Sequence, residues 1–467
     1  MEKKIKKYKP IYDFLIMGLF IAIALMVASY YGIERIFNSN FICTNGDYQS
    51  YNILRRFLDG QIPYKDFSNY LGMGIVALCG PFLSMHNSFT ASLFVTNMIS
   101  SFCFIMFVYT IFYTITDNKY ISAFVSLLMP QALVSDLFIK YLPVHGGYID
   151  SYLTALAYPG NSFRVGRMFL MVLLCAAAYL CIYFYQNKYP DGVIRKAVAN
   201  PKGITFIGFV TGLGMTWSND FGFCCIGSVT LIVIMLTIAD AVKKEDKFIR
   251  KRFIYYIPSL LVGMFFSVAI ASRGNISSWL EFTSGVSQWQ YTYYGRMKAE
   301  KILTLSQLLE HKYTMINLGI FRVLMLFCLI MLLCNKADDR MIIYVFMFVT
   351  VVAVEIFYII GSGPDDLKEC AYSFIALMFM ALPISILVKV IKSIKMSVVL
   401  NILLIVLIGQ YASYSNQANK ALYDKYLAED MKNNPYYVAE MEGITRYREA
   451  LYIMENTTGD EKLFSTY

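Results

Sequence analysis

Residues 44–74 read TNGDYQSYNILRRFLDGQIPYKDFSNYLGMG, a polar and tyrosine-rich segment that follows the first long apolar stretch of the chain. The segment carries three acidic residues, Asp47, Asp59 and Asp66. The chain around it is 57% hydrophobic and only 16% charged over 467 residues, which excludes an ordinary soluble domain. The sequence therefore predicts a polytopic membrane protein with this segment as a loop at one membrane face.

The first half of the loop predicts a helix. In YQSYNILRRFLDG, the apolar residues Tyr51, Leu54 and Leu58 recur at helical spacing, and Gly60 is a suitable C-terminal stop. We expect this amphipathic helix to lie along the membrane surface. The next stretch, LGMGIVALCGPFLSM, is short and interrupted by a glycine and a proline, so we expect a second helix at the interface rather than a span.

Apolar stretches of about 20 residues, the length that crosses about 30 Å of hydrocarbon, recur along the chain. We expect an all-α bundle of about 11 transmembrane helices. The spans are predicted to start near Ile11, Ser88, Tyr120, Val165, Gly203, Phe221, Phe253, Thr314, Met341, Ala371 and Met396. The fifth should be short, because the polar run WSND at residues 217–220 interrupts it as a tight hairpin.

Basic residues indicate the orientation. The runs KKIKKYK at residues 3–9 and KKEDKFIRKR at residues 243–252 fall on one side, which the positive-inside rule assigns to the cytoplasm. Such runs set orientation and contact lipid headgroups, and we expect no nucleic-acid partner. The N-terminus is then cytoplasmic in a plasma membrane, and the composition suits a bacterium. The predicted division is a membrane domain at 1–412, with its first outer loop at about 34–87, and an extracytoplasmic tail at 413–467.

This topology gathers the polar loops on the outside. They are the residue 44–74 segment, a loop at about 136–164, the hairpin at 217–220, a large loop at about 273–313, and the turn GSGPDDLKEC. The inside receives only short basic connectors. Chemistry or binding is therefore expected on the extracytoplasmic face.

The first loop resembles that of the GT-C superfamily of integral-membrane glycosyltransferases, of the dolichyl-phosphate-mannose protein mannosyltransferase and aminoarabinose transferase type. In that family an acidic residue beyond the first helix precedes a short helix, a G-x-x-P-Y-x-D-F element and a Y-x-P-G-like entry into the next helix. The matching residues are Asp47, Pro63, Tyr64, Asp66, Phe67, Tyr70, Gly72 and Gly74. Met73 stands near the place of the usual proline.

The resemblance implies transfer of a hexosyl or pentosyl group from a polyprenyl-phosphate donor to a lipid- or polymer-linked acceptor of the cell envelope. It assigns Asp47 as the general base that takes the proton of the acceptor hydroxyl. Spacing alone leaves an alternative open, because aspartate is also a common cap of a following helix.

The segment YPGNSFRVGR supplies candidate cations for the donor phosphate. Arg164 and Arg167 are three residues apart at the predicted start of the fourth span, so they share a helix face. The guanidinium group suits phosphate oxygens, and GT-C enzymes commonly place an arginine near this position. The alternative is contact with lipid headgroups at the interface.

The hairpin TGLGMTWSNDFGF resembles a further GT-C segment, with Asp220 in the acidic position and Ser218 where the family often has lysine. Asp220 is a candidate contact for acceptor hydroxyls or a divalent cation, or it simply forms the turn. Asp66 is a secondary candidate whose expected role is to hold the Pro-Tyr turn. Tyr64 and His145 are further candidate acceptor contacts.

Metal and cofactor requirements stay open at this stage. The three histidines are far apart in sequence, so a zinc site gains no support, and a divalent cation remains an alternative. A disulfide between Cys43 and Cys370 is conceivable because both are expected outside. The main functional alternative is a polysaccharide or lipid translocator, or a protein like an O-antigen polymerase. The enzyme is favoured because the acidic residues concentrate at one face rather than at the midplane, where transporters bind.

Overall fold

The computed structural model describes residues 15–29, 45–69, 71–86, 89–123, 126–127, 164–218, 220–243, 251–290, 329–334 and 337–362. These residues are predominantly helical and contain no strand, in agreement with the all-α prediction. The helices are α2 (Asn45–Leu58), α3 (Gly74–His86), α4 (Phe89–Thr116), α8 (Arg164–Tyr185), α9 (Val193–Val198), α10 (Pro201–Leu213), α11 (Phe221–Lys243), α12 (Arg252–Ala271), α13 (Ile276–Gln290) and α16 (Asp339–Ser362). A further apolar helix spans Leu15–Ser29.

Three of the described helices are long and apolar enough to cross a membrane: Gly166–Tyr185, Phe221–Lys243 and Arg252–Ala271. Helices α4 and α16 begin close to two more of the expected span starts. The spans expected near Ala371 and Met396, and the tail at 413–467, lie outside the described residues. The chain is thus a helical membrane protein, and the structure covers part of the expected bundle.

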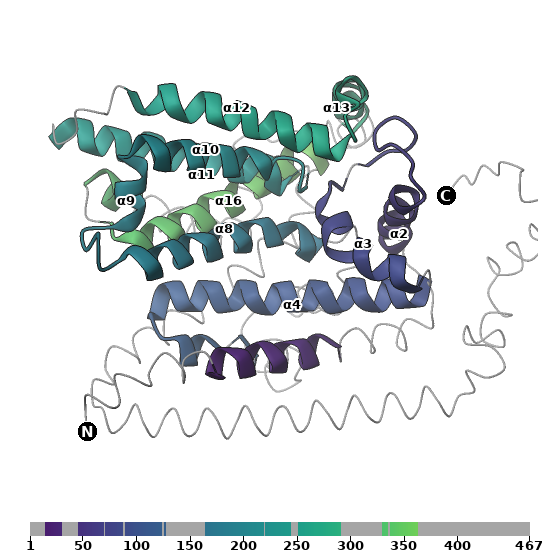
Figure 1. The fold of residues 1–467 in the computed structure, drawn as a ribbon, viewed down its shortest axis with the longest axis horizontal. Coiled ribbons are helices and arrows are strands. Elements are labelled where there is room, and N and C mark those ends of the chain that lie inside the picture. Colours follow the sequence, from purple (N-terminus) through teal and green to yellow (C-terminus); the bar gives the residue numbers. More distant parts are fainter. Residues whose placement is uncertain are drawn as a thin grey trace, which may run out of the picture.

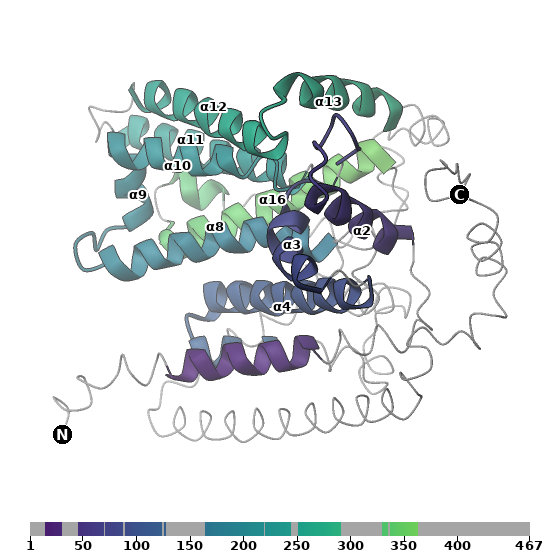
Figure 2. The same cartoon turned by 45° about the vertical axis from the view of Figure 1, so that its right-hand side comes forward.

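The long helices lie side by side in a bundle, with the Leu15–Ser29 helix next to α4 (Figure 1). Their ends fall into two groups. At one end, α8 and α11 begin and α10 and α12 finish; we call it the Arg167 end. At the other end α9 joins α8 to α10, and we call it the α9 end (Figure 2). The described parts of the loops that were expected outside all lie at the Arg167 end.

Helix α10 is short, as expected, with 13 residues. It begins at Pro201, whose missing N–H costs nothing because the first N–H groups of a helix have no partner within it. Asn200 caps the helix, since its side chain accepts a hydrogen bond from the Lys202 N–H at 2.9 Å. It ends at Gly214, just before the polar hairpin.

Helices α10 and α12 pack closely because their contact surfaces carry glycine. A Cβ atom added to Gly212 would lie 2.3 Å from the Leu260 carbonyl oxygen, and one added to Gly263 would lie 2.2 Å from that of Phe209. Both distances are too short for any larger residue. Small residues of this kind allow helix backbones to approach in membranes, where apolar burial between helices contributes little.

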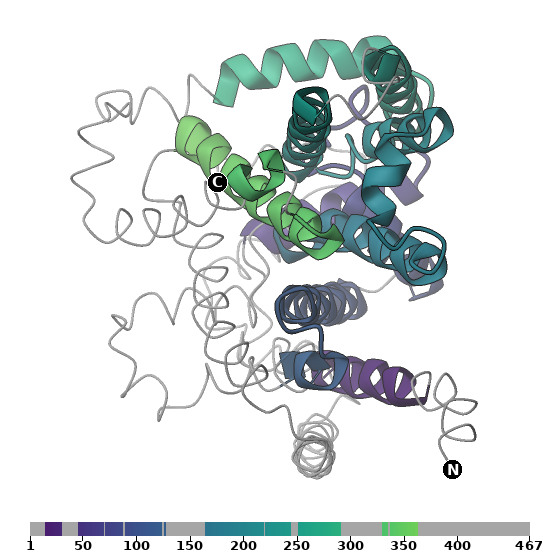
Figure 3. The ribbon, with the colours of Figure 1, turned by 90° about the vertical axis from the view of Figure 1, so that its left-hand side faces the viewer.

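Two helices lie crosswise at the Arg167 end. Figure 3, which looks along the bundle, shows α13 running across the long helices, and α2 is seen nearly end-on in Figure 1. Helix α2 is the amphipathic helix expected from the first loop, and it ends before Gly60, which has φ 86°. Leu58 is 40% exposed, and Ile53 is buried beside Leu54.

Candidate functional site at the Arg167 end

An ion pair joins two residues that the sequence placed in separate motifs. Arg167 lies in the first turn of α8, and its Nη1 donates to Asp220 Oδ2 at 2.6 Å. The side chains are 12% and 6% exposed, so the pair is largely withdrawn from solvent. Removing one partner of an ion pair this deeply buried is costly, because the other charge is left without compensation. The pair therefore ties the start of α8 to the hairpin that precedes α11.

The hairpin between α10 and α11 is held from two other directions. The Thr216 N–H donates to Ser267 Oγ of α12 at 3.1 Å, and Trp217 Nε1 donates to the Gly166 carbonyl of α8 at 3.1 Å. Asp220 Oδ1 accepts the Phe221 N–H at 2.8 Å, so this carboxylate also forms the start of α11. The turn expected at Asp220 therefore occurs together with an ion pair that the sequence did not predict.

The end of the first loop docks on this hairpin through its backbone. The Met73 N–H donates to the Thr216 carbonyl at 2.7 Å, and the Gly74 N–H donates to the Trp217 carbonyl at 2.8 Å. Gly72 has φ 90°, and an added Cβ would lie 2.5 Å from the Trp217 carbonyl oxygen. Only glycine fits a left-handed conformation at such close approach. The G-x-G element of the first loop is thus shaped for contact with the hairpin.

Three helix N-termini meet at this site, those of α3, α8 and α11. None of their first turns contains an acidic residue. Each N-terminus carries a partial positive charge, which makes Arg167 unfavourable there unless an anion compensates it. Asp220 supplies one such charge at the junction of α8 and α11. The partial positive charges of the three N-termini also favour a bound anion, since helix N-termini commonly bind phosphate.

Asp66 holds the turn that follows α2. Its Oδ2 accepts the Ile62 N–H at 2.7 Å, and its backbone carbonyl accepts a hydrogen bond from Arg56 Nη1 at 3.2 Å. This is the turn-fixing role expected from the sequence. With one carboxylate oxygen used by the backbone, Asp66 is a structural residue of the loop in this conformation.

Tyr64 lies in the same turn and has φ 70°, an uncommon conformation for a residue with a side chain. Its ring packs against Phe282 of α13, with centroids 5.2 Å apart, and its side chain is buried. Burial raises the pKa of the Tyr64 hydroxyl above its usual value, and the neighbouring Trp279 side chain opposes this only in part. The hydroxyl is therefore a protonated donor at neutral pH.

The other candidates are placed only in part. Asp47 is the third residue of α2, so its backbone lies in the first turn of a crosswise helix at the Arg167 end, and its side chain is outside the description. Arg164 is the first residue of α8, again without a described side chain. His145 lies outside the described residues, as do Cys43 and Cys370.

Sequence reasoning missed Arg273, at the corner between α12 and α13. Arg273 and Gly274 both have left-handed backbone conformations, with φ 49° and 85°. Arg273 Nη2 donates to the Phe57 carbonyl at 2.9 Å, and its guanidinium lies 4.2 Å from the centre of the Phe57 ring. Arg273 thus binds the C-terminal end of α2 by a hydrogen bond and a cation–π contact. The dipeptide Arg-Gly directly after an apolar span was the available signal.

Asn69 is a second residue that the sequence did not single out. It is fully buried just before the docked Gly72, and its Oδ1 has no hydrogen-bond partner among the described residues. Its Nδ2 contacts the Met73 sulfur at 3.5 Å. A buried amide oxygen of this kind is a ready acceptor for a water or ligand hydroxyl.

A metal centre gains no geometric support in the described part of the chain. No three or more His, Cys, Asp or Glu side chains cluster there at spacing suited to a metal ion. Asp220, the candidate cation ligand, directs one oxygen to Arg167 and the other to the Phe221 N–H. What the site offers is a buried ion pair, converging helix N-termini and a docked polar loop.

Comparison with known proteins adds no relative to this picture. The chain matches none of the protein-family models, none of the curated proteins and none of the solved structures with which it was compared.

Proposed function

We propose that this chain is a GT-C-type membrane glycosyltransferase that moves a sugar from a polyprenyl-phosphate donor to a cell-envelope acceptor. One observation carries the proposal: the three segments that resemble GT-C motifs meet at one end of the bundle. The first loop bonds to the hairpin through Met73 and Gly74, and the hairpin bonds to α8 through Trp217 and Asp220. Independent motifs gain weight when they form one site.

The donor phosphate would bind at the start of α8. Arg164 and Arg167 are three residues apart on this helix, so both stand on one face near three helix N-termini. Asp220 holds the Arg167 guanidinium in a fixed position. Arg164, with the charge of Arg167 beside it, then supplies charge-assisted hydrogen bonds to the phosphate, and the polyprenyl chain stays in the lipid.

The transfer step needs one base. The acceptor oxygen forms a bond to the anomeric carbon while the bond from that carbon to the phosphate oxygen breaks, and its electron pair leaves with the phosphate. The acceptor proton passes to the Asp47 carboxylate. A single displacement of this kind inverts the anomeric centre. Tyr64 and Asn69, from the same loop, are the proposed acceptor contacts.

The decisive experiment replaces the base without changing its shape. Asp47→Asn cannot take the proton, so transfer by the purified protein should fall by about 10²-fold, while binding of a polyprenyl-phosphate sugar changes little. Asp59→Asn is the matched control, because Asp59 lies in the same loop, is 53% exposed and pairs only with Arg55 at 3.5 Å among the described residues. It should transfer like the wild type.

Arg164→Ala should show the opposite pattern, with weaker donor binding from the loss of a charge-assisted contact. Unchanged transfer by Asp47→Asn would refute the base assignment. Unchanged transfer and donor binding in both variants would instead favour the lipid or polysaccharide translocator.

A further inference from the structure

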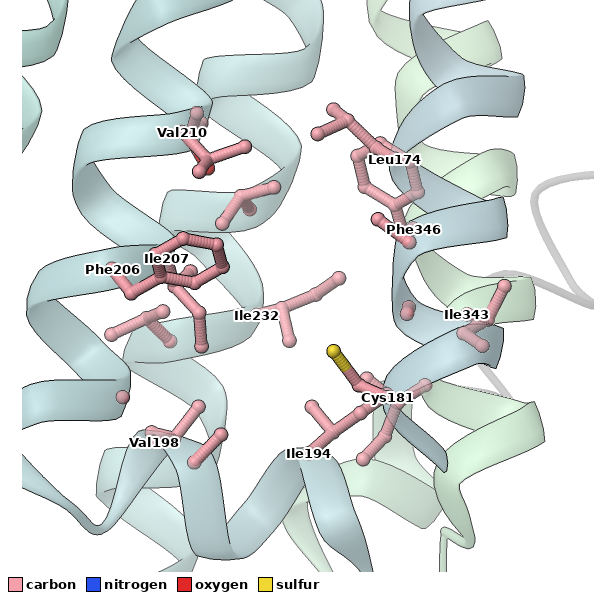
Figure 4. Close-up of a pocket in the computed structure, with 18 of the residues that line it drawn as sticks. Leu174, Cys181, Ile194, Val198, Phe206, Ile207, Val210, Ile232, Ile343 and Phe346 are labelled. Carbon is pink, nitrogen blue, oxygen red and sulfur yellow. The ribbon is translucent and has the colours of Figure 1, made fainter. Parts of the chain in front are cut away.

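An apolar groove lies between α8 and α10, away from the candidate site. Its volume is about 220 Å³, far more than the ~10–15 Å³ that one water needs. Figure 4 shows Phe206 and Val210 of α10 facing Leu174 and Cys181 of α8 across it, with Ile232 of α11 behind. The lining is almost entirely carbon, so the groove suits hydrocarbon rather than water.

The groove is open at the surface of the bundle. Phe206 at its edge is 63% exposed, and Cys181 is exposed as well. Along α10 it extends from Gly203 to Thr211, which is about 12 Å at 1.5 Å per residue. This is less than half of the ~30 Å hydrocarbon core, so the groove lies within one leaflet.

The groove does not continue to the Arg167 end. There α8 and the turn after α10 are in contact, because a Cβ added to Gly214 would lie 3.0 Å from Leu170, and Trp217 Nε1 bonds to the Gly166 carbonyl. At the other end the groove is bounded by Ile194 and Val198 of α9 (Figure 4). The groove thus begins only two residues from the start of α10, so the polar part of a molecule that fills it lies nearest the α9 end.

The chain segment around that end of the groove is basic, and its nearest carboxylate from another helix, Asp339, is bound to the start of α9. The segment 186–203 carries Lys188, Arg195, Lys196 and Lys202 against a single acidic residue, Asp191. Lys196 and Lys202 are exposed, and each is adjacent in sequence to a residue that lines the groove, Ala197 and Gly203. Basic residues at the rim of an apolar groove complement the phosphate of an anionic lipid.

We propose that this groove binds an anionic glycerophospholipid, with one acyl chain between α8 and α10 and the phosphate beside Lys196 and Lys202. This site is separate from the proposed transfer site and lies in the opposite half of the bundle. It would make the packing of α9 against the long helices depend on the headgroup charge of the surrounding leaflet.

Cysteine protection on the unmodified chain tests the proposal directly. Cys181 lines the groove, whereas Cys334, also exposed, does not. Dioleoyl phosphatidylglycerol added to the delipidated protein should slow alkylation of Cys181 by N-ethylmaleimide at least tenfold more than dioleoyl phosphatidylcholine does. Alkylation of Cys334 should proceed at the same rate with either lipid.

Native mass spectrometry of single variants completes the test. Lys196→Gln and Lys202→Gln should each weaken phosphatidylglycerol binding about fivefold, the effect of one basic residue near an anionic surface, and leave phosphatidylcholine binding unchanged. Lys65→Gln is the control, because Lys65 is exposed and lies at the Arg167 end, away from the groove, so lipid binding should not change. Cys181→Phe should fill the groove and lower binding of both lipids, while Cys334→Phe should not.

Equal protection of Cys181 by the two lipids, or no effect of either lysine variant, would overturn the proposal. Stronger protection by a polyprenyl phosphate than by phosphatidylglycerol would also overturn it, because the groove would then hold the donor chain. None of these measurements involves sugar transfer, so failure of the proposed enzyme function would leave the result intact.

Discussion

At the scale of single residues, the Arg167–Asp220 pair dominates the candidate site. A pair this far withdrawn from solvent loses much hydration, and its net contribution to stability depends on both partners being present. The pairing spans 53 positions of the chain. Local patterns identified Arg167 and Asp220 as interesting, but no pattern within one motif could show that each is the other's partner.

The pair predicts a strong asymmetry between single and double substitutions. Arg167→Met or Asp220→Leu alone should lower the free energy of unfolding by about 3–5 kcal/mol, because each leaves a buried charge behind. The double variant should recover most of this stability. Denaturation in detergent measures all three.

Arg340 and Asp117 provide the control for this experiment. Their pair has an N···O distance of 2.5 Å but side chains 43% and 46% exposed, so its single variants should cost less than about 1 kcal/mol. A double variant at Arg167 and Asp220 as unstable as either single one would contradict a mutual pairing.

Tyr64 predicts a pH effect. Its pKa is raised in the folded protein, so the folded state prefers the neutral hydroxyl. The stabilisation is complete below the unfolded tyrosine pKa of about 10 and is lost as pH rises toward the folded value. Wild-type protein should therefore lose more thermal stability between pH 8 and pH 11 than Tyr64→Phe does. Tyr185→Phe, which alters a half-exposed side chain, should follow the wild type.

At the scale of helices, the sequence predicted which segments are helical better than it predicted which of their residues are buried. The polar run at 217–220 correctly predicted that α10 ends early. The helical spacing of apolar residues in the first loop correctly predicted the position of α2. Of the apolar residues of α2, Ile53 and Leu54 are buried against the protein, whereas Leu58, its last residue, is 40% exposed. Which residues face inward depends on what the helix packs against, and that information lies elsewhere in the chain.

The glycine contact between α10 and α12 predicts a position-dependent cost. Gly212→Ala would place a methyl group 2.3 Å from the Leu260 carbonyl, so the helices must separate, at a cost of about 1–3 kcal/mol. Gly227→Ala on α11 meets nothing within 4 Å and should be neutral or stabilising. Thermal unfolding of the two variants gives the comparison. Equal stability would show that α10 and α12 are not closely packed.

At the scale of the whole molecule, the two ends differ in chemistry as well as in position. The Arg167 end gathers the first loop, the hairpin and the Arg273 corner, while the α9 end carries the basic segment 186–203. We predict that a cysteine introduced at Lys65 reacts with a membrane-impermeant maleimide in intact cells. One introduced at Lys188 should react only after lysis.

These labelling experiments need a chain in which four cysteines are replaced by serine: Cys181 and Cys334, which are exposed, and Cys43 and Cys370, which are expected on the outer face. The reverse pattern would place the candidate site on the cytoplasmic side and remove the argument for an extracytoplasmic lipid-linked donor.

The short helix α9 has a consequence for the order of assembly. Gly192, at its start, offers no capping side chain, and its Val193 and Ile194 N–H groups donate instead to the Asp339 carboxylate at 2.6 and 3.0 Å. During synthesis, the ribosome must add about 145 further residues before that cap exists. Until then, α9 lacks the Asp339 carboxylate at its N-terminus, and a nascent chain stopped before residue 339 would lack a fixed connection between α8 and α10.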